Sequence, residues 1–302
     1  MVTQGDPEGI GPELLLRLGD ADALRPGDRV IADLARLERL ARDLATPWAA
    51  RGLERLAPLV VDEPGGQVAA LARAVDLVLA DPGTALVTAP IDKARARAEG
   101  LAFPGHTEYL AARAGVDDVA MLMVGPRLRV VPVTIHVPLR AVPDLLTTSA
   151  IVRCGRLLGH VLCHHFGLAA PRIGVLGLNP HAGESGLLGD EEARVVAPAV
   201  AELGAWAAAA GLPCRFTGPL AADTAFVTHA EGRLDALLAM YHDQGLGPFK
   251  LLHMRDGVNM TLGLPFTRTS PDHGTARDIA GRGVADPGSM LAAVALARGH
   301  VP

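Results

Sequence analysis

Four histidines lie in polar segments that contain glycine or proline: His106 in Gly-His-Thr-Glu, His136 in Ile-His-Val-Pro, His181 in Asn-Pro-His-Ala-Gly-Glu and His242 in Tyr-His-Asp-Gln-Gly. A neutral imidazole is the commonest protein ligand of a metal ion, and three of them leave a coordination position open for a substrate. A lone histidine is more often a packed core residue, but four at the ends of predicted strands favour a metal site. Their spacing does not say which three would bind, because no HExxH-type signature is present.

A second group of residues could bind an anion. Lys250 follows Asp243-Gln-Gly-Leu-Gly-Pro-Phe, Asn259 lies in Gly-Val-Asn-Met-Thr, and Arg268 begins Arg-Thr-Ser-Pro-Asp-His-Gly-Thr. Lysine supplies a point charge and arginine a planar fork, a usual combination for phosphate or carboxylate. Lys250 and Lys93 are the two lysines among 28 lysine and arginine residues. Ordinary salt bridges are the alternative for each residue alone, whereas their occurrence together in loops with glycine and proline favours a ligand.

Alternating strands and helices must position these side chains. Short apolar runs predict strands over 29–32, 57–61, 85–88, 119–124, 128–134, 172–178, 236–240 and 258–262. Apolar residues at helical spacing predict helices over 34–45, 67–80, 150–166 and 191–210. This alternation indicates βαβ units and a largely parallel sheet, in an α/β fold. In such folds ligands bind where loops leave the carboxyl ends of the strands, and the histidine motifs follow predicted strands.

Composition excludes several classes of protein. The chain has 302 residues, of which 49% are hydrophobic and 20% charged, and a net charge of -5. This is the composition of a globular protein without a basic surface for nucleic acid. No apolar run approaches the ~20 residues of a membrane span, and the first residues lack a secretory signal pattern. Three cysteines without a CxxC pair fit a reducing compartment, so we expect a cytoplasmic protein.

The common nucleotide-binding fingerprints are absent. No GxxxxGK[ST] motif occurs, and three segments close to GxGxxG, which begin at Gly9, Gly245 and Gly281, each lack the third glycine. A dinucleotide site would therefore be of another kind. The residues by themselves predict a metal-dependent enzyme that acts on a small anionic molecule.

Blocks along almost the whole sequence resemble the 4-hydroxythreonine-4-phosphate dehydrogenase family of pyridoxal phosphate biosynthesis. The matching blocks are Gly-Asp-Pro-Glu-Gly-Ile-Gly-Pro-Glu at 5–13, Thr-Ala-Pro-Ile-Asp-Lys at 88–93, Phe-Pro-Gly-His-Thr-Glu at 103–108, His-Val-Pro-Leu at 136–139, Gly-Leu-Asn-Pro-His-Ala-Gly-Glu at 177–184, Gly-Pro-Leu-Ala-Ala-Asp-Thr at 218–224, Met-Tyr-His-Asp-Gln-Gly at 240–245, Gly-Val-Asn-Met-Thr-Leu-Gly-Leu-Pro at 257–265 and Arg-Thr-Ser-Pro-Asp-His-Gly-Thr at 268–275. So many ordered blocks make the resemblance specific.

The resemblance implies a fold like that of isocitrate and isopropylmalate dehydrogenases, with two α/β/α lobes and a cleft between them. We expect lobes of roughly 1–136 plus 268–302 and 137–267. It also implies a homodimer whose active sites combine residues of both subunits. The cofactors it implies are NAD or NADP, bound without the glycine fingerprint, and one divalent metal ion.

The resemblance also assigns the site residues. His136, His181 and His242 match the family's metal ligands, and a second set matches its substrate contacts: His106, Thr107, Lys250, Asn259 and Arg268. Three imidazoles favour Zn²⁺ or Co²⁺, and the resemblance keeps Mg²⁺ open. Asp223 and Asp243 are candidate bases or partners of the metal ligands, with a helix cap or salt bridge as the alternative. Lys93 is either an acid/base group or a member of an ion pair.

The expected reaction is oxidation of the C3 hydroxyl of 4-phosphohydroxy-L-threonine to a β-keto acid, which decarboxylates to 3-amino-2-oxopropyl phosphate. One alternative is a related dehydrogenase acting on 4-phosphoerythronate, threonate 4-phosphate or a dihydrodiol. Another is a metal-dependent lyase or aldolase that polarises a carbonyl with the same histidines and turns over without a nicotinamide. A non-catalytic phosphate-binding protein is a third alternative, but such a protein has no need of three metal-binding histidines.

Overall fold

The computed structural model describes residues 1–81 and 83–300. Over the described residues the chain forms two compact units: unit 1 comprises residues 1–117 and 255–300, and unit 2 comprises residues 118–254. The expected limit at 267/268 falls between the two strands of the antiparallel pair 258–262 with 268–271, and both of these strands lie in unit 1. None of the helices in the described part of the chain combines the length and the apolar character that a membrane crossing requires.

Unit 1 alternates short strands with helices. Its strands are β1 (Val2–Thr3), β2 (Val30–Ala32), β3 (Val60–Asp62), β4 (Leu86–Thr88), β10 (Val258–Leu262) and β11 (Arg268–Pro271). Its helices are α1 (Gly11–Asp20), α2 (Leu34–Leu44), α3 (Pro47–Leu56), η1 (Ala57–Leu59), α4 (Gly66–Ala80), α5 (Lys93–Ala98), α6 (His106–Ala114) and α12 (Gly288–Ala297).

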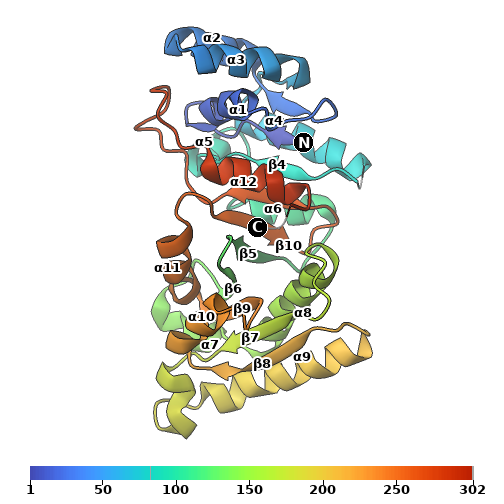
Figure 1. Cartoon of the computed structure of the whole chain (residues 1–302), viewed down its shortest axis with the longest axis vertical. Helices are drawn as coiled ribbons and strands as arrows, with labels where there is room; N and C mark the ends of the chain where they lie inside the picture. Colours follow the sequence, from blue (N-terminus) through green and yellow to red (C-terminus); the bar gives the residue numbers. More distant parts are fainter. Residues whose placement is uncertain (82, 301–302) are drawn as a thin grey trace. The chain divides into compact units, whose positions relative to one another are not determined.

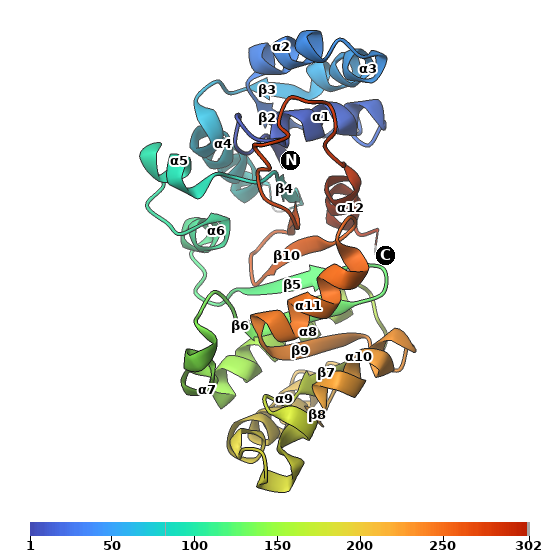
Figure 2. The same cartoon turned by 90° about the vertical axis from the view of Figure 1, so that its left-hand side faces the viewer.

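The strands of unit 1 lie in the order β3-β2-β1-β4-β11-β10. All neighbouring pairs are parallel except β10 and β11, which are antiparallel. Helices α4 and α6 lie on one face of these strands and α1 and α12 on the other (Figures 1 and 2). The unit is therefore an α/β/α layer structure whose strand ends can carry a site.

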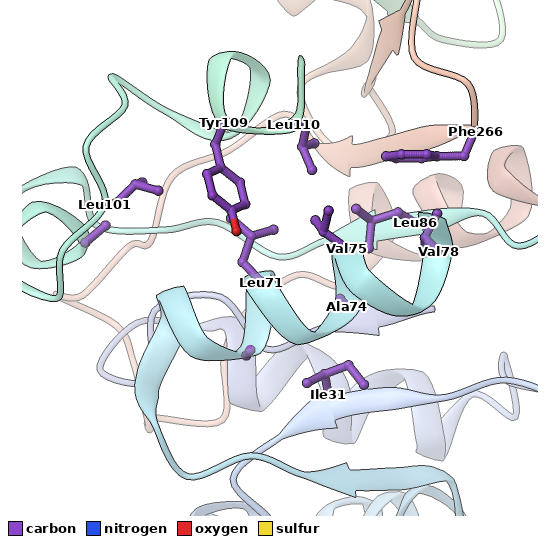
Figure 3. Close-up of a cluster of buried hydrophobic side chains, with 12 residues drawn as sticks. Ile31, Leu71, Ala74, Val75, Val78, Leu86, Leu101, Tyr109, Leu110 and Phe266 are labelled. Atoms are coloured by element: carbon purple, nitrogen blue, oxygen red, sulfur yellow. The ribbon is translucent and has the colours of Figure 1, made fainter. Parts of the chain in front are cut away.

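Helix α4 shows why the apolar spacing produces this packing. Its buried residues Ala70, Leu71, Ala74, Val75 and Val78 follow the i, i+3, i+4 pattern that places them on one face. Figure 3 shows that face against side chains of the strands and of α6, in a cluster that includes Ile31, Leu86, Tyr109, Leu110 and Phe266. Each fully buried leucine, isoleucine or valine side chain of this cluster contributes about 1.5–3 kcal/mol to the free energy of folding.

Unit 2 has a second α/β/α arrangement. Its strands are β5 (Ala120–Val124), β6 (Arg129–Thr134), β7 (Arg172–Leu176), β8 (Arg215–Leu220) and β9 (Ala236–Tyr241). Its helices are η2 (Leu139–Ala141), α7 (Val142–Leu145), α8 (Thr148–His164), η3 (Pro180–Gly186), η4 (Glu192–Val196), α9 (Ala197–Ala209), α10 (Ala222–Ala230) and α11 (His242–His253).

The strands of unit 2 lie in the order β5-β6-β9-β7-β8, and the β6-β9-β7-β8 pairs are parallel. Figure 2 shows α10 and α11 in front of these strands and α8 behind them. Phe249 and Leu246 of α11 pack with Val130, Leu237 and other apolar residues in the core beneath α11. The predicted α/β class and seven of the eight predicted strand segments are confirmed. The predicted strand 57–61 is confirmed only at Val60 and Val61, because Ala57–Leu59 form η1, and β1, β8 and β11 were not predicted.

Candidate functional site

His136 and His242 lie side by side in unit 2. Strands β6 and β9 are parallel neighbours, and Thr134 at the end of β6 is paired with Tyr241 at the end of β9. His136 follows β6 by two residues, and His242 directly follows β9 as the first residue of α11. The centroids of the two imidazole rings are 5.8 Å apart. Parallel register therefore places two of the predicted metal ligands at one edge of the strands, as the strand-end rule predicts.

A cavity of about 420 Å³ opens beside these two imidazoles. It is lined by Thr134, Ile135, His136, Val137, Leu139, Val142, Tyr241, His242 and Asp243. Its volume is in the range of small-molecule sites, and its lining combines an apolar wall with a few polar groups. Tyr241 and Thr134 were not among the predicted site residues, because a residue that ends a strand gives no separate signal in the sequence.

Asp243 contacts the His242 ring. Its Oδ1 lies 2.7 Å from His242 Nδ1, in the first turn of α11. A carboxylate on one ring nitrogen fixes the orientation of an imidazole and leaves the other nitrogen for a metal ion. Asp223 is placed differently: it lies in the first turn of α10, where its Oδ1 accepts a hydrogen bond from the Thr224 amide. It is not among the described residues that line the cavity.

His181 lies on a loop with unusual backbone geometry. This loop follows β7, and His181, Ala182, Glu184 and Ser185 have φ values of 52°, 52°, 42° and 57°. Left-handed backbone costs about 1–2 kcal/mol for each residue that has a Cβ. His181 is exposed at the surface of the chain. The described residues bring His136 and His242 together, but they contain no group of three or more His, Cys, Asp or Glu side chains that could hold a metal ion.

Unit 1 carries the other predicted residues. His106 and Thr107 are the first two residues of α6, and Gly105 before them provides no side-chain cap. The first amide groups of a helix have no partners within the helix and favour an anion. Lys93 begins α5, and its Cε would lie 3.8 Å from a Cβ built on Gly105. The lysine side chain therefore lies against the start of α6, and His106 is at the start of a helix instead of the predicted strand end.

Burial and positive charge keep His106 neutral. Desolvation, followed by the charges of Arg268 and Lys93, holds the pKa of His106 well below 6.5. Its Nε2 is buried and has no hydrogen-bond partner. Because a buried polar atom without a partner is costly, a ligand that bonds to Nε2 would be favoured.

Arg268 is a buried cation on β11. Only 3% of the residue is exposed, and burial lowers the pKa of its guanidinium to about 10, so it remains charged at neutral pH. One terminal nitrogen donates to Thr261 Oγ1 at 2.9 Å and the other to Thr88 Oγ1 at 2.6 Å. Its Nε is buried without a partner. Two neutral hydroxyls do not compensate a buried charge, so this position favours an anionic ligand.

Asn259 shares this environment. It lies on β10 and is paired with Ser270 of β11. Two residues further along β10, Thr261 is paired with Arg268. Residues at this spacing point to the same face of a strand. The Oδ1 of Asn259 is also buried without a partner. The antiparallel pair β10-β11 thus presents an amide and a guanidinium on one face.

Lys250 and Arg268 were predicted in loops, and that prediction was wrong, whereas Asn259 lies on a strand, as the predicted strand 258–262 required. Lys250 is half-buried on α11, Asn259 lies on β10 and Arg268 on β11. The glycines and proline before Lys250 suggested a loop, but Gly245 is needed where α11 contacts β6: a Cβ there would lie 2.9 Å from a methyl group of Val130. Pro248 also lies inside this helix.

Comparisons with known proteins agree along the chain. Residues 56–297 match the sequence model of the family described as pyridoxal phosphate biosynthetic protein PdxA. A curated relative from Aromatoleum aromaticum named 4-hydroxythreonine-4-phosphate dehydrogenase is 47% identical over 319 residues, which cover 99% of this chain and 95% of the relative. One of the same name from Desulfosudis oleivorans is 44% identical and covers 98% and 94%.

Solved structures show the same likeness. A 4-hydroxythreonine-4-phosphate dehydrogenase from Klebsiella pneumoniae has a TM-score of 0.84 and 38% identity, with 98% of this chain and 97% of that chain covered. A terephthalate 1,2-cis-dihydrodiol dehydrogenase from Burkholderia xenovorans has a TM-score of 0.66 and 27% identity, with 99% and 97% covered. An isocitrate dehydrogenase from Methylococcus capsulatus, at a TM-score of 0.51 and 15% identity with 99% and 84% covered, confirms the expected fold alone. With four-fifths of its length inside the family model and relatives well above 40% identity, the chain belongs to the PdxA family of pyridoxal phosphate biosynthetic proteins.

Proposed function

We propose that this chain is a metal-dependent NAD(P) dehydrogenase that oxidises 4-phosphohydroxy-L-threonine, the substrate in the names of its relatives. The observation that carries the proposal is the group of unsatisfied polar atoms in unit 1: Arg268 Nε, Asn259 Oδ1 and His106 Nε2 are buried without partners. A phosphorylated substrate supplies the negative charge and the oxygen atoms that the two nitrogens need.

Each residue of this group has a distinct role in binding. Arg268 directs its free Nε–H to a phosphate oxygen while Thr88 and Thr261 hold its terminal nitrogens. The amides at the start of α6, with the Thr107 hydroxyl, donate to the same anion. Lys93 contributes a second positive charge beside His106. Lys250 on α11 is a further cationic contact of the substrate, as the family resemblance implies.

The imidazoles of His136 and His242 fit a divalent ion. They line a cavity of about 420 Å³. Asp243 contacts the Nδ1 of the His242 ring, which leaves the lone pair of Nε2 for coordination of the ion. We propose His181 as the third ligand, and Zn²⁺ or Co²⁺ as the ion, because imidazole suits these metals better than Mg²⁺. When bound, such an ion supplies a Lewis acid that lowers the pKa of the C3 hydroxyl.

When bound, a nicotinamide would supply the acceptor for the C3 hydride, and the β-keto acid product would decarboxylate to 3-amino-2-oxopropyl phosphate. The residues of the chain would hold the C3 hydroxyl of the substrate in a fixed position relative to the nicotinamide. Charged contacts of unit 1 at the phosphate hold the substrate in one orientation, and such positioning is worth several kcal/mol of the barrier and about 7–11 kcal/mol in the best cases.

A second copy of this chain would complete the site. Among the described residues, nine of the eleven large hydrophobic side chains that are exposed lie in unit 2: Val137, Leu139, Leu145, Leu187, Leu188, Val227, Leu251, Leu252 and Met254. Leu187 is 80% exposed and follows His181 in the same loop, and Leu251 is 86% exposed on α11. Exposed apolar side chains gathered on one unit favour an interface. We therefore propose a homodimer in which His181 of one subunit joins His136 and His242 of the other.

The substrate assignment is tested by comparing initial rates of NAD(P) reduction. The substrates are 4-phosphohydroxy-L-threonine, 4-phosphoerythronate and an aromatic cis-dihydrodiol, each with added Zn²⁺ or Co²⁺. We expect the first to be fastest and the dihydrodiol slowest, since it leaves Arg268 without an anion. A faster rate with 4-phosphoerythronate would assign the chain to a sister activity. Turnover without any nicotinamide would indicate a lyase instead.

A further inference from the structure

The loop that carries His181 (residues 177–189, the His181 loop) holds a conformation that its own residues disfavour. Four of its residues with a Cβ have left-handed φ values, and they frame Gly183 at +78°. Such a run persists only where the surrounding structure fixes it, and strained segments of this kind cluster at functional sites. The contacts that fix the His181 loop therefore decide where the His181 imidazole points.

A buried carboxylate lies under this loop. Glu192 is 5% exposed and is the first residue of the π-helical turn η4. Its Oε1 accepts a hydrogen bond from the Asn179 backbone N–H at 2.7 Å, and its Oε2 accepts one from Asn179 Nδ2 at 3.0 Å. Glu191 Oε2 accepts from the same Nδ2 at 2.7 Å. The chain two residues before His181 is thus held by both its backbone and its side chain.

The same carboxylate lies against the backbone on both sides of His181. A Cβ on Gly177 would lie 3.0 Å from Glu192 Oε1, and a Cβ on Gly183 would lie 2.6 Å from Oε2. Only glycine allows the carboxylate to approach at both positions. Glu192 therefore spans the His181 loop from its start to its left-handed turn.

Gln244 ties the loop to the strand that leads to His242. Its Nε2 donates to the Gly177 carbonyl at 2.8 Å, and its Oε1 accepts from the Met240 amide at 2.7 Å. Met240 is the last but one residue of β9. The base of the His181 loop is therefore fixed to the strand end from which His242 emerges, while Glu192 fixes the part that contains His181.

We propose that Glu192 is a positioning residue for the metal site: through Asn179 and the glycines of the His181 loop, it sets the direction of the His181 imidazole. This inference rests on the proposed role of His181 as a metal ligand. Groups that orient a ligand from outside the coordination sphere typically change metal affinity about 10–100-fold when they are removed. A purely structural carboxylate would change the stability of the fold without that effect.

The test measures Zn²⁺ affinity directly by calorimetry on the folded, metal-stripped protein. For Glu192→Ala we expect an affinity about 10–100-fold weaker, with a kcat that recovers when Zn²⁺ is raised to saturation. Glu192→Gln keeps an acceptor for the Asn179 N–H but turns its amide toward Asn179 Nδ2, which Glu191 still holds, so its affinity should fall less than that of Glu192→Ala. The matched control is Glu202→Gln on α9, an exposed carboxylate 3.1 Å from Arg156, which should bind Zn²⁺ like the wild type.

Wild-type Zn²⁺ affinity in Glu192→Ala, with a lower Tm, would overturn the inference, as would a Gln variant as impaired as the Ala variant. If Glu192→Ala does not fold, Asn179→Ala replaces the test: it removes the Nδ2 donor without adding a charge beside Glu191 and Glu192, and it must weaken Zn²⁺ binding. His181→Ala separates the two proposals. Unchanged Zn²⁺ binding there refutes the ligand role, whereas lost binding there with retained binding in Glu192→Ala refutes only the positioning role.

Discussion

At the scale of single residues, Arg268 is a buried cation for which we propose an anionic ligand. Its partners are two hydroxyl groups, and its Nε has none. We expect Arg268→Met to lower kcat/KM for the phosphorylated substrate by about 100-fold, mostly through KM, because a charge-assisted hydrogen bond contributes about 1.5–3 kcal/mol.

The same substitution should leave the Tm unchanged or raise it, since it removes a desolvated charge from the core. Steady-state kinetics and a thermal melt of the ligand-free protein check both parts. A large loss of Tm together with unchanged KM would mean that Arg268 is a structural residue.

His106 makes the stability of the protein depend on pH. Burial and then the charges of Arg268 and Lys93 hold its folded-state pKa well below 6.5. Between the two pKa values the unfolded chain binds more protons, so the free energy of unfolding falls as the pH drops through about 6.5, by at most about 1.4 kcal/mol per pH unit for one group. Well above that pH His106 is neutral in both states, so it no longer makes the free energy of unfolding depend on pH.

Urea unfolding of the wild type and His106→Gln at about pH 7.5 and about pH 5.5 measures this contribution. The variant should lose less stability on acidification than the wild type. His229, whose pKa is also lowered by burial, remains in both proteins and cancels in the comparison. Equal losses would show that the imidazole of His106 is not held in a neutral state.

At the scale of elements, helix α11 offers a matched pair of glycines. A Cβ on Gly245 would lie 2.9 Å from a Val130 methyl group and 3.2 Å from Ala239 Cβ, whereas Gly247 has nothing within 4 Å. Gly245→Ala should cost about 1–3 kcal/mol by pushing α11 away from β6 and β9, and Gly247→Ala should stabilise by up to about 1 kcal/mol.

Because His136 and His242 follow β6 and β9, the Gly245 variant should also bind Zn²⁺ more weakly, while the Gly247 variant should not. Urea unfolding and calorimetry measure the two effects. Equal behaviour of both variants would mean that the contact between α11 and the strands is not what spaces the two imidazoles.

The elements also show which structural features the sequence predicts. Apolar runs located β6, β7 and β9, and therefore located the three histidine motifs that follow strands. Strand β11 was missed because its residues, Arg268 to Pro271, are polar although all are buried. Their polarity conflicts with the hydrophobic signal of a buried strand, a conflict that is common at functional sites. Helix α11 was missed because its glycines and its proline are typical of a loop.

The order of the strands in the sheet could not be predicted from the sequence either. The apolar pattern predicts that β6 and β9 exist, but their adjacency depends on pairings between residues about a hundred positions apart, such as Thr134 with Tyr241. The positioning contacts of Glu192 and Asn179 gave no signal in the sequence beyond a pair of glutamates in a polar segment. Side-chain hydrogen bonds of this kind depend on three-dimensional packing that spacing does not encode.

At the scale of the whole molecule, the proposed homodimer predicts complementation between inactive variants. His181→Ala and His242→Ala should each lose Zn²⁺ binding and NAD(P) reduction. If the partner subunit supplies His181, a mixed dimer of the two variants contains one site with both substitutions and one intact site. Unfolding and refolding the two proteins together at a 1:1 ratio should then restore roughly a quarter of the wild-type activity.

A chain that carries both substitutions, refolded with the wild type, provides the control, because each mixed dimer then has one substitution in each site. No gain of activity from mixing the two single variants would place His181 in the same subunit as His136 and His242. Sedimentation analysis of the mixed sample confirms that the dimers have exchanged.

The most direct measurement of the central claim is NAD(P) reduction with 4-phosphohydroxy-L-threonine before and after removal of metal. We expect chelation to abolish the activity, Zn²⁺ or Co²⁺ to restore it in the wild type, and neither ion to restore it in His136→Ala or His242→Ala. Undiminished oxidation of this substrate by metal-stripped protein, or full activity in either histidine variant, would contradict the account.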